Sequence, residues 1–212
     1  MNKLTQIFYE KAPFGLFSSN DTAVLLPGSD NSRQGLVKRA LANDEIIKIR
    51  RGLYCLNRKF QQKPVNTFAI AQHVYGPSYI SLESALNYHG WIPEAVYACT
   101  NASLKNSKEF NTPLGLFSYK RVPQKILYAG VDRIKDSNGN IFLMATALKA
   151  LADYIYIHKL DWLGTKPAIK SLRVEPDEFE KLSSEDFDEI SNNYRSQRVL
   201  DFLKSLQKEL KL

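Results

Sequence analysis

Long hydrophobic runs are absent from this chain of 212 residues. No stretch approaches the roughly 18 consecutive apolar residues that a membrane-spanning helix needs. The N-terminal segment is polar and amphipathic, and it lacks the apolar centre of a signal peptide. We therefore expect a cytoplasmic protein that has no membrane partner.

Cysteine and histidine are scarce, which limits the available metal and disulfide chemistry. The two cysteines, Cys55 and Cys99, are far apart in the sequence, and the three histidines (His73, His89 and His158) are dispersed. Metal sites draw their ligands from closely spaced residues, and disulfide frameworks need several cysteine pairs. We expect no metal site, no cofactor, and cysteines that act as small buried hydrophobes.

Catalytic motifs are missing as well. The sequence has no glycine-rich phosphate loop, no GxSxG nucleophile elbow and no zinc-knuckle spacing. Asp132, Asp136 and Asp153 are carboxylates of the kind that nucleases use, but no spacing supports such a set. We therefore predict that the chain is not an enzyme, and we name no catalytic residue.

Positive charge is what the chain has in excess. Its 29 Lys and Arg residues outnumber its 22 Asp and Glu residues and give a formal net charge of +7. Residues 1–62 hold 10 basic and 5 acidic side chains, whereas residues 63–212 hold 19 and 17. Eight of the bases lie between Asn31 and Lys59. Such a dense positive field favours a polyanionic partner, and charge alone would suit either nucleic acid or an anionic membrane surface.

The first third of the chain begins with two predicted short helices. Apolar residues recur at helical spacing over residues 3–11, and two helix-disfavouring residues follow, Pro13 and Gly15. A second helix is predicted over residues 20–26, with Ser19 or Asn20 as its N-cap.

A third helix and a basic hairpin complete this region. The helix is predicted to begin near Asn31-Ser32, where either side chain can accept a hydrogen bond from first-turn N–H groups. Two β-favouring runs, residues 46–50 and 53–56, are separated by Arg51-Gly52 and predict a hairpin with an arginine-rich tip. Three short helices followed by a basic hairpin is the order of a winged helix-turn-helix, which places its third helix in the major groove of DNA.

The basic residues of this region are the candidates for DNA contact. Lys38 and Arg39 lie opposite the apolar side of the third helix, so we predict that they contact base edges and a nearby phosphate. Arg33 is predicted to bind a phosphate beside the helix N-terminus, and the hairpin tip to reach phosphates or the minor groove. The predicted DNA-contacting residues are Ser32, Arg33, Lys38, Arg39, Lys48, Arg50 and Arg51.

A second domain is predicted from residue 63 onwards, after a polar linker at residues 61–64. Helices are expected from Asn66, after a cap at Ser81, and along a stripe formed by Leu148, Leu151, Ala152 and Ile155. Strands are expected over residues 95–100, 115–120, 126–135 and 141–143. Hydrophobic residues make up 44% of the chain, enough for a sizeable core. We therefore predict an α+β fold with domains at residues 1–62 and 63–212, the second a mixed α/β domain ending in helices.

Two charged segments of the second domain stand out. Residues 102–135 contain seven bases and two acids, and they could extend a DNA surface, meet an RNA or an acidic partner, or form a solvated sheet face. The candidate secondary basic surface consists of Lys105, Lys108, Lys120, Arg121 and Lys125. Residues 175–189 are acidic, and Ser183 or Ser184 is predicted to cap a helix there. A final helix carries apolar residues from Val199 to Leu210 that either pack within the chain or bind a partner or second copy.

Three segments resemble a known protein family. Ile49–Tyr54 (IRRGLY) looks like the wing of that family, Tyr79–Pro93 (YISLESALNYHGWIP) like its most recognisable stretch, and Lys149–Asp153 (KALAD) like one of its later helices. Through these segments, residues 3–157 resemble the AbiEi-type antitoxins of bacterial type IV toxin–antitoxin systems. Ala147-Leu148 departs from the family pattern, which usually has a proline and a glutamate there.

The resemblance implies a function that the residues alone do not specify. It implies a winged helix that binds inverted repeats in its own promoter, and a C-terminal domain that counters a nucleotidyltransferase-like toxin encoded alongside. It also implies neutralisation without a stable toxin–antitoxin complex. We therefore expect a DNA-binding transcriptional autorepressor and antitoxin, of an oligomeric state that the sequence does not specify. The alternatives are a stand-alone winged-helix regulator whose second domain senses a ligand or protein, and a nuclease with a DNA-targeting domain.

Overall fold

A computed structural model describes residues 1–12 and 14–212, so Pro13, one of the residues predicted to end the first helix, lies outside the described residues. The N-terminal part contains three helices and a small antiparallel sheet of strand order β1-β3-β2. In chain order its elements are α1 (Lys3–Lys11), β1 (Leu16–Ser18), α2 (Ser19–Leu25), α3 (Asp30–Ala42), β2 (Ile46–Arg50), β3 (Leu53–Leu56) and a 3-10 turn, η1 (Arg58–Phe60). The three predicted helices and the hairpin are confirmed, whereas β1 was not predicted.

Two helix starts differ from the sequence prediction. Ser18, rather than Ser19 or Asn20, caps α2: its hydroxyl accepts from the backbone N–H of Asp21, whose carboxylate accepts from Ser18 N. The chain passes from β1 into α2 without a loop, so the last strand residue serves as the cap. Ser29, rather than Asn31 or Ser32, caps α3, because the helix begins immediately after the Pro27-Gly28 turn.

The second part is built around a six-stranded mixed sheet of order β6-β7-β5-β4-β9-β8. The β5–β7 and β4–β9 pairs are parallel, and the other pairs are antiparallel. Its elements up to the last strand are α4 (Thr67–Val74), β4 (Tyr79–Ile80), α5 (Leu82–Tyr88), β5 (Ala98–Ser103), β6 (Lys108–Thr112), β7 (Gly115–Arg121), β8 (Val131–Lys135) and β9 (Ile141–Ala145). Five helices follow: α6 (Ala147–His158), α7 (Lys166–Leu172), α8 (Pro176–Glu180), α9 (Ser184–Ser191) and α10 (Gln197–Leu210).

The predicted α+β class is therefore confirmed, with local corrections to the strands. The strand predicted over residues 95–100 runs from Ala98 to Ser103, and the one predicted over residues 126–135 begins only at Val131. Ile126 projects into solvent with 65% of its surface exposed, so its apolar character misled the prediction. β6 was missed because its sequence, KEFNT, is largely exposed and polar, as suits an edge strand.

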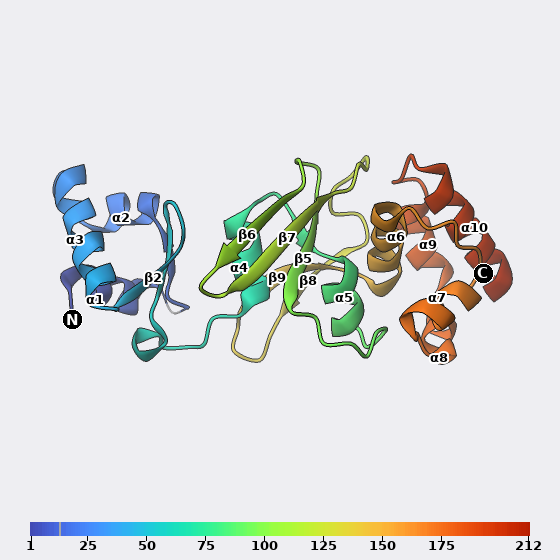
Figure 1. Ribbon diagram of the computed structural model, residues 1–212, viewed down its shortest axis with the longest axis horizontal. Coiled ribbons are helices and arrows are strands. Elements are labelled where there is room, and N and C mark those ends of the chain that lie inside the picture. The colour runs from blue at the N-terminus through green and yellow to red at the C-terminus, as the bar shows by residue number, and fades with distance from the viewer. Residues whose placement is uncertain (13) are drawn as a thin grey trace.

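Helices cover both faces of the large sheet. Neighbouring strand residues point to opposite faces. Tyr119 donates its hydroxyl proton to Ala71 O of α4, and Thr100 on the other face accepts from Ser84 N of α5. Figure 1 shows the N-terminal part at one end, the sheet in the middle, and helices α6–α10 at the other end.

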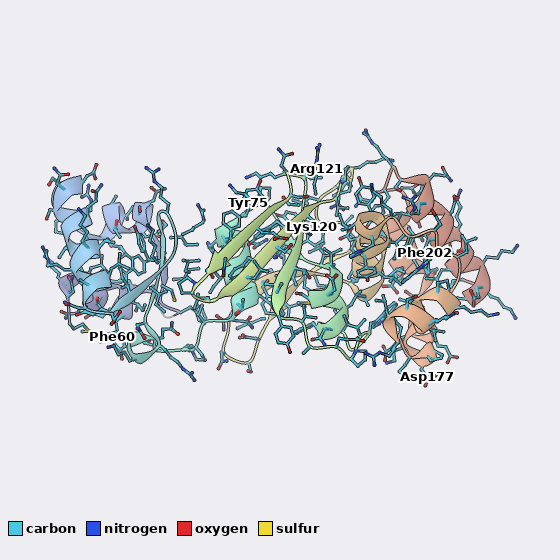
Figure 2. The ribbon with its side chains drawn as sticks, viewed as in Figure 1. Phe60, Tyr75, Lys120, Arg121, Asp177 and Phe202 are labelled. Carbon is cyan, nitrogen blue, oxygen red and sulfur yellow. The ribbon has the colours of Figure 1, made fainter. Side chains whose placement is uncertain are left out.

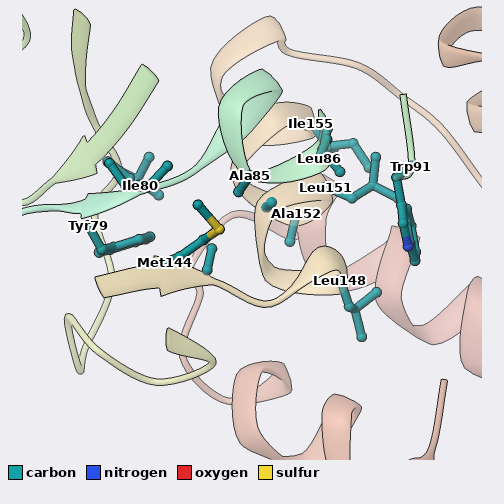
Figure 3. Close-up of a cluster of buried hydrophobic side chains, with 14 of the residues drawn as sticks. Tyr79, Ile80, Ala85, Leu86, Trp91, Met144, Leu148, Leu151, Ala152 and Ile155 are labelled. Atoms are coloured by element: carbon teal, nitrogen blue, oxygen red, sulfur yellow. The ribbon is translucent and has the colours of Figure 1, made fainter. Parts of the chain in front are cut away.

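The main core lies between the sheet and α6. The predicted stripe of Leu148, Leu151, Ala152 and Ile155 is fully buried, and Figure 3 shows it beside α5 and the strand residues Tyr79, Ile80 and Met144. The final helix, α10, packs against α6 and α9 and buries Val199, Phe202, Leu203 and Leu206. Of the two predicted fates for that helix, packing within the chain is thus confirmed. Among the described residues, no helix has the length and apolarity needed to cross a membrane.

The hairpin connects the two parts through apolar contacts. Ile46 and Leu56 belong to the small N-terminal core with α1 and α3. Ile49, Leu53 and Cys55 are instead buried in the same cluster as the apolar side chains of α4. The sheet of the N-terminal part therefore has a protein core on each face.

Candidate nucleic-acid interface

A groove of about 580 Å³ separates α3 from α2 and the β2–β3 hairpin. The sequence-predicted residues Lys38 of α3, Lys48 of β2 and Arg51 of the hairpin turn all line it. Strand alternation explains the placement of Lys48, because its neighbours Ile47 and Ile49 face the protein while it points outward. Three bases that are separate in sequence thus meet at one surface.

These cations are available to an external anion. Lys38, Arg39, Lys48 and Arg51 are all exposed. Among the described residues, none of their charged nitrogens has a carboxylate oxygen within 4.0 Å. Because no internal carboxylate neutralises them, their field extends into solvent, where it attracts polyanions.

Arg33 also lines this groove, but its guanidinium has partners within the chain. Its guanidinium donates to the carbonyl oxygens of Gly28 at 2.5 Å and Leu26 at 3.3 Å, and it pairs with the carboxylate of Asp30 at 2.5 Å. These contacts stabilise the turn between α2 and α3. Ser32, also predicted to contact DNA, is exposed in the first turn of α3, and its N–H donates to the Ser29 cap.

The two hairpin arginines, Arg50 and Arg51, lie in different surroundings. A register irregularity separates Lys48 from Arg50 in the pairing of β2 with β3. Arg51 lines the groove, whereas Arg50 donates from Nη2 to the carbonyl oxygen of His73, 3.1 Å away at the end of α4. Arg50 thereby binds the negative end of a helix dipole in the second part of the chain.

The candidate secondary basic surface lies along β6, β7 and the neighbouring turns. Lys105 donates to the carbonyl oxygen of Gly76 and lies over the ring of Tyr75, and Lys108 lies over Phe110. Lys120 is paired with Glu109 at 3.1 Å, so it contributes less free charge. Figure 2 labels Lys120 and Arg121 of β7, and Tyr75 at the end of α4. Arg50 of the hairpin donates to the carbonyl oxygen of His73, and Lys105 donates to the carbonyl oxygen of the nearby Gly76. The candidate secondary basic surface therefore adjoins the hairpin.

A second polar centre lies inside the second part, around the fully buried side chains of Lys149 and Asp153. The Nζ atom of Lys149 is 2.9 Å from Asp153 Oδ1, and it also donates to Gln124 Oε1 and to the hydroxyl of Tyr194, each at 2.7 Å. Asp153 further accepts from the hydroxyls of Tyr79 at 2.8 Å, Ser81 at 2.7 Å and Tyr194 at 2.5 Å. All three ammonium protons and both carboxylate oxygens therefore have partners.

Burial dominates the titration of this centre. It lowers the pKa of Lys149, against the opposing effect of Asp153, and it raises the pKa of Tyr79 and of Tyr194 well above the ordinary value for tyrosine. A charged pair persists at such a depth only when it is fully hydrogen-bonded. Ser81 shows how Asp153 obtains its hydrogen bonds. Ser81 occupies the N-cap position of α5 as predicted, but its hydroxyl donates to Asp153 instead of capping the helix.

Ser81 also leads into an unusual backbone segment. Leu82 has a φ of +57°, in the left-handed region that favours glycine. The carbonyl of Ser81 accepts from Thr100 Oγ1 at 2.7 Å, and Thr100 Oγ1 accepts in turn from Ser84 N. Bonds to the strand and to Asp153 thus hold the turn on both sides of Leu82.

The sequence contains one local signal for this centre, in α6. Lys149 and Asp153 are four positions apart, so they share one face of α6, and that face lies within an otherwise apolar helix. A Lys–Asp pair on such a face predicts that both side chains are buried and hydrogen-bonded to further polar groups. The partners Tyr79, Gln124 and Tyr194 come from distant segments, and no local pattern identifies them.

The cysteines have the character expected from sequence. Both are free and buried, and burial raises the pKa of Cys55 to about 11 and that of Cys99 to about 12. Within the described part of the chain, no group of three or more His, Cys, Asp or Glu residues could hold a metal ion. Neither protein-family models nor curated proteins give a match to this sequence.

Proposed function

We propose that the N-terminal part is a winged helix-turn-helix and that the protein is a DNA-binding transcriptional autorepressor. The observation that carries this proposal is the meeting of Lys38, Lys48 and Arg51, exposed and without carboxylate partners, around one groove. The element order supports it, because α3 is followed directly by the β2–β3 hairpin, which serves as the wing.

In this proposal α3 enters the major groove of duplex DNA. Lys38 and Arg39 then reach base edges and a nearby phosphate, since both project from the exposed side of the helix. Arg51, at the tip of the wing, binds a backbone phosphate. Arg33 positions α3 through the turn before it, and Arg50 fixes the wing to α4.

We further propose, from the resemblance to AbiEi-type antitoxins, that the protein is the antitoxin of a type IV system. It would act in the cytoplasm, not as an enzyme, against a nucleotidyltransferase-like toxin. One buried cluster joins two of the segments that carry the resemblance to this family. Tyr79 and Ser81 come from one segment and Lys149 and Asp153 from another, and all four meet in the buried polar centre.

The alternative function is that of a stand-alone winged-helix regulator with a sensing domain. A groove of about 540 Å³ in the second part favours it, because cavities of this size hold small molecules or peptide side chains. The presence of a toxin gene beside this one distinguishes the two proposals. Rescue of growth when the neighbouring gene is co-expressed supports the antitoxin, and absence of any rescue supports the regulator.

An electrophoretic mobility shift tests the repressor proposal. The probe is DNA from upstream of the protein's own gene, titrated with salt beside scrambled competitor. The Lys38→Ala/Arg51→Ala variant is compared with Lys204→Ala/Lys208→Ala, which removes the same charge from exposed sites on α10. We expect specific, salt-sensitive binding that only the first variant loses. Equal binding to scrambled DNA, or equal losses in both variants, contradicts the proposal.

A further inference from the structure

Helices leave part of one face of the large sheet bordering a groove. Thr100 of β5 and Ser118 of β7 are paired residues on the face that α5 covers. Towards β6 that face borders the groove of about 540 Å³ mentioned above, which we call the sheet groove. Its walls come from the start of α5, the end of α6, the end of α7 and the segment before β5. Its apolar lining consists of Leu82, Ile92, Val96, Leu116, Ile157 and Leu172.

A second hollow adjoins the sheet groove across one tyrosine. This hollow, of about 330 Å³, shares Val96, Tyr97, Ala98 and Leu116 with the groove. Tyr97 stands between the two hollows with 94% of its surface exposed, and Leu116 beside it is 38% exposed. Tyrosine side chains in such a setting supply much of the binding energy of protein interfaces, because they bury a large area at a small entropic cost.

The rim of the sheet groove has a charge opposite to that of the molecule. Glu83, Glu94 and Glu109 line it, with Lys120 as the one ammonium group among the lining residues. Lys120 and Ser118 both donate to Oε1 of Glu109. Arg173 pairs with Glu94, and Glu83 faces the imidazole of His158 at 3.4 Å, which neutralises it only when protonated. Cations thus balance Glu94 and Glu109, and among the described residues Glu83 is the lining carboxylate that no Lys or Arg balances.

We propose that the sheet groove and its adjoining hollow form a docking site for a partner polypeptide that presents apolar side chains next to Lys or Arg. The sheet groove accepts an apolar anchor, and the adjoining hollow, which is also lined by Asn66, Ser84 and Asn87, accepts a more polar part of the same segment. Two linked hollows of different character suit a peptide segment better than one compact small molecule. Glu83, which no Lys or Arg of the described chain balances, selects basic neighbours of the apolar anchor. This proposal does not depend on DNA binding, because the site shares no residue with the groove beside α3.

Selection from a phage-displayed library of random linear peptides tests the proposal. The full-length protein is the target, and the Tyr97→Ala/Leu116→Glu variant is used to remove unrelated binders. We expect the enriched peptides to share an apolar residue next to Lys or Arg. Synthetic copies should bind the wild-type protein in fluorescence anisotropy and lose about tenfold or more in affinity with Tyr97→Ala. Tyr97 is almost fully exposed, so this variant should keep the wild-type melting temperature.

Two controls make the result specific. Tyr128→Ala truncates another exposed tyrosine outside the site and should leave peptide affinity unchanged. Glu83→Gln should weaken the peptides and reduce the salt dependence of their binding. The proposal is overturned by acidic or patternless peptides, by peptides that bind the double variant equally well, or by equal losses with Tyr97→Ala and Tyr128→Ala. Failure of DNA binding would leave these outcomes unaffected.

Discussion

The two parts of the molecule use lysine in opposite ways. Lys38 and Lys48 of the N-terminal part are exposed and have no carboxylate partner in the described chain, whereas Lys149 of the second part is fully buried with every proton bonded. An unpaired surface cation contributes little to folding but leaves a field for a ligand. A buried cation contributes nothing to that field, and it makes the fold depend on its partners. Charge alone therefore does not identify a functional residue; burial and pairing do.

The largest expected effect comes from breaking the buried pair. Asp153→Asn keeps the shape of the side chain but removes the charge that balances Lys149 and turns one acceptor into a donor facing hydroxyl groups. We expect the free energy of unfolding, measured by urea denaturation, to fall by about 3–5 kcal/mol.

The exposed pair of Arg198 and Asp161 supplies the control for that prediction. Asp161→Asn should lower the free energy of unfolding by less than about 1 kcal/mol, because solvent screens the pair. The Lys149→Met/Asp153→Leu variant removes both charges at once and should recover much of the loss. Equal effects of Asp153→Asn and Asp161→Asn on the free energy of unfolding would show that the buried pair contributes no more to stability than a surface ion pair.

Replacing the exposed cations should affect DNA binding and leave stability nearly unchanged. Lys38→Ala and Arg39→Ala should each cost roughly 1–3 kcal/mol of discrimination if the side chain contacts a base edge. The measurement is the ratio of affinities for the operator and for operators with single base changes. Unfolding curves of the same variants should overlay the wild-type curve. An unchanged affinity ratio would place base recognition elsewhere on the protein.

Local patterns were sufficient to predict most elements of the N-terminal part. The helices over residues 3–11 and 30–42 and the hairpin are short-range structures, set by apolar spacing, caps and a turn. β1 escaped prediction because three residues carry no readable period, and their strand conformation comes from pairing with β3. In the second part, β6 escaped for a similar reason: its pairing with β7 is a tertiary contact.

The candidate sites differ in the same way. The exposed positions of Lys38 and Arg51 could be predicted because their surroundings are local, and the sequence shows which side of the helix and hairpin they occupy. The partners of Lys149 could not be predicted, because Tyr79 lies 70 residues before it in the sequence and Tyr194 lies 45 residues after it. Long-range side-chain geometry follows from the topology of the sheet and leaves no period in the sequence.

Two adjacent arginines sharpen the distinction within the hairpin itself. Arg51→Ala should lower the slope of log affinity against log salt by about one unit, because it removes one phosphate contact. Arg50→Ala should change the slope less, since Arg50 is bonded to the carbonyl of His73 in the second part. The measurement is a salt titration of operator affinity for both variants. A larger slope change with Arg50→Ala would mean that the wing approaches DNA from the opposite side.

The smallest effect is expected at Arg33. The sequence groups this residue with the cations that contact DNA, whereas the structure groups it with those bonded inside the chain. The sequence predicts a phosphate contact, yet the guanidinium bonds Gly28, Leu26 and Asp30 within the turn before α3. Arg33→Ala should therefore lower the free energy of unfolding by about 1 kcal/mol and leave the salt slope unchanged. If the slope instead falls by about one unit, as with Arg51→Ala, the guanidinium leaves the turn when DNA binds. Arg33 would then couple the positioning of α3 to phosphate contact at its N-terminus.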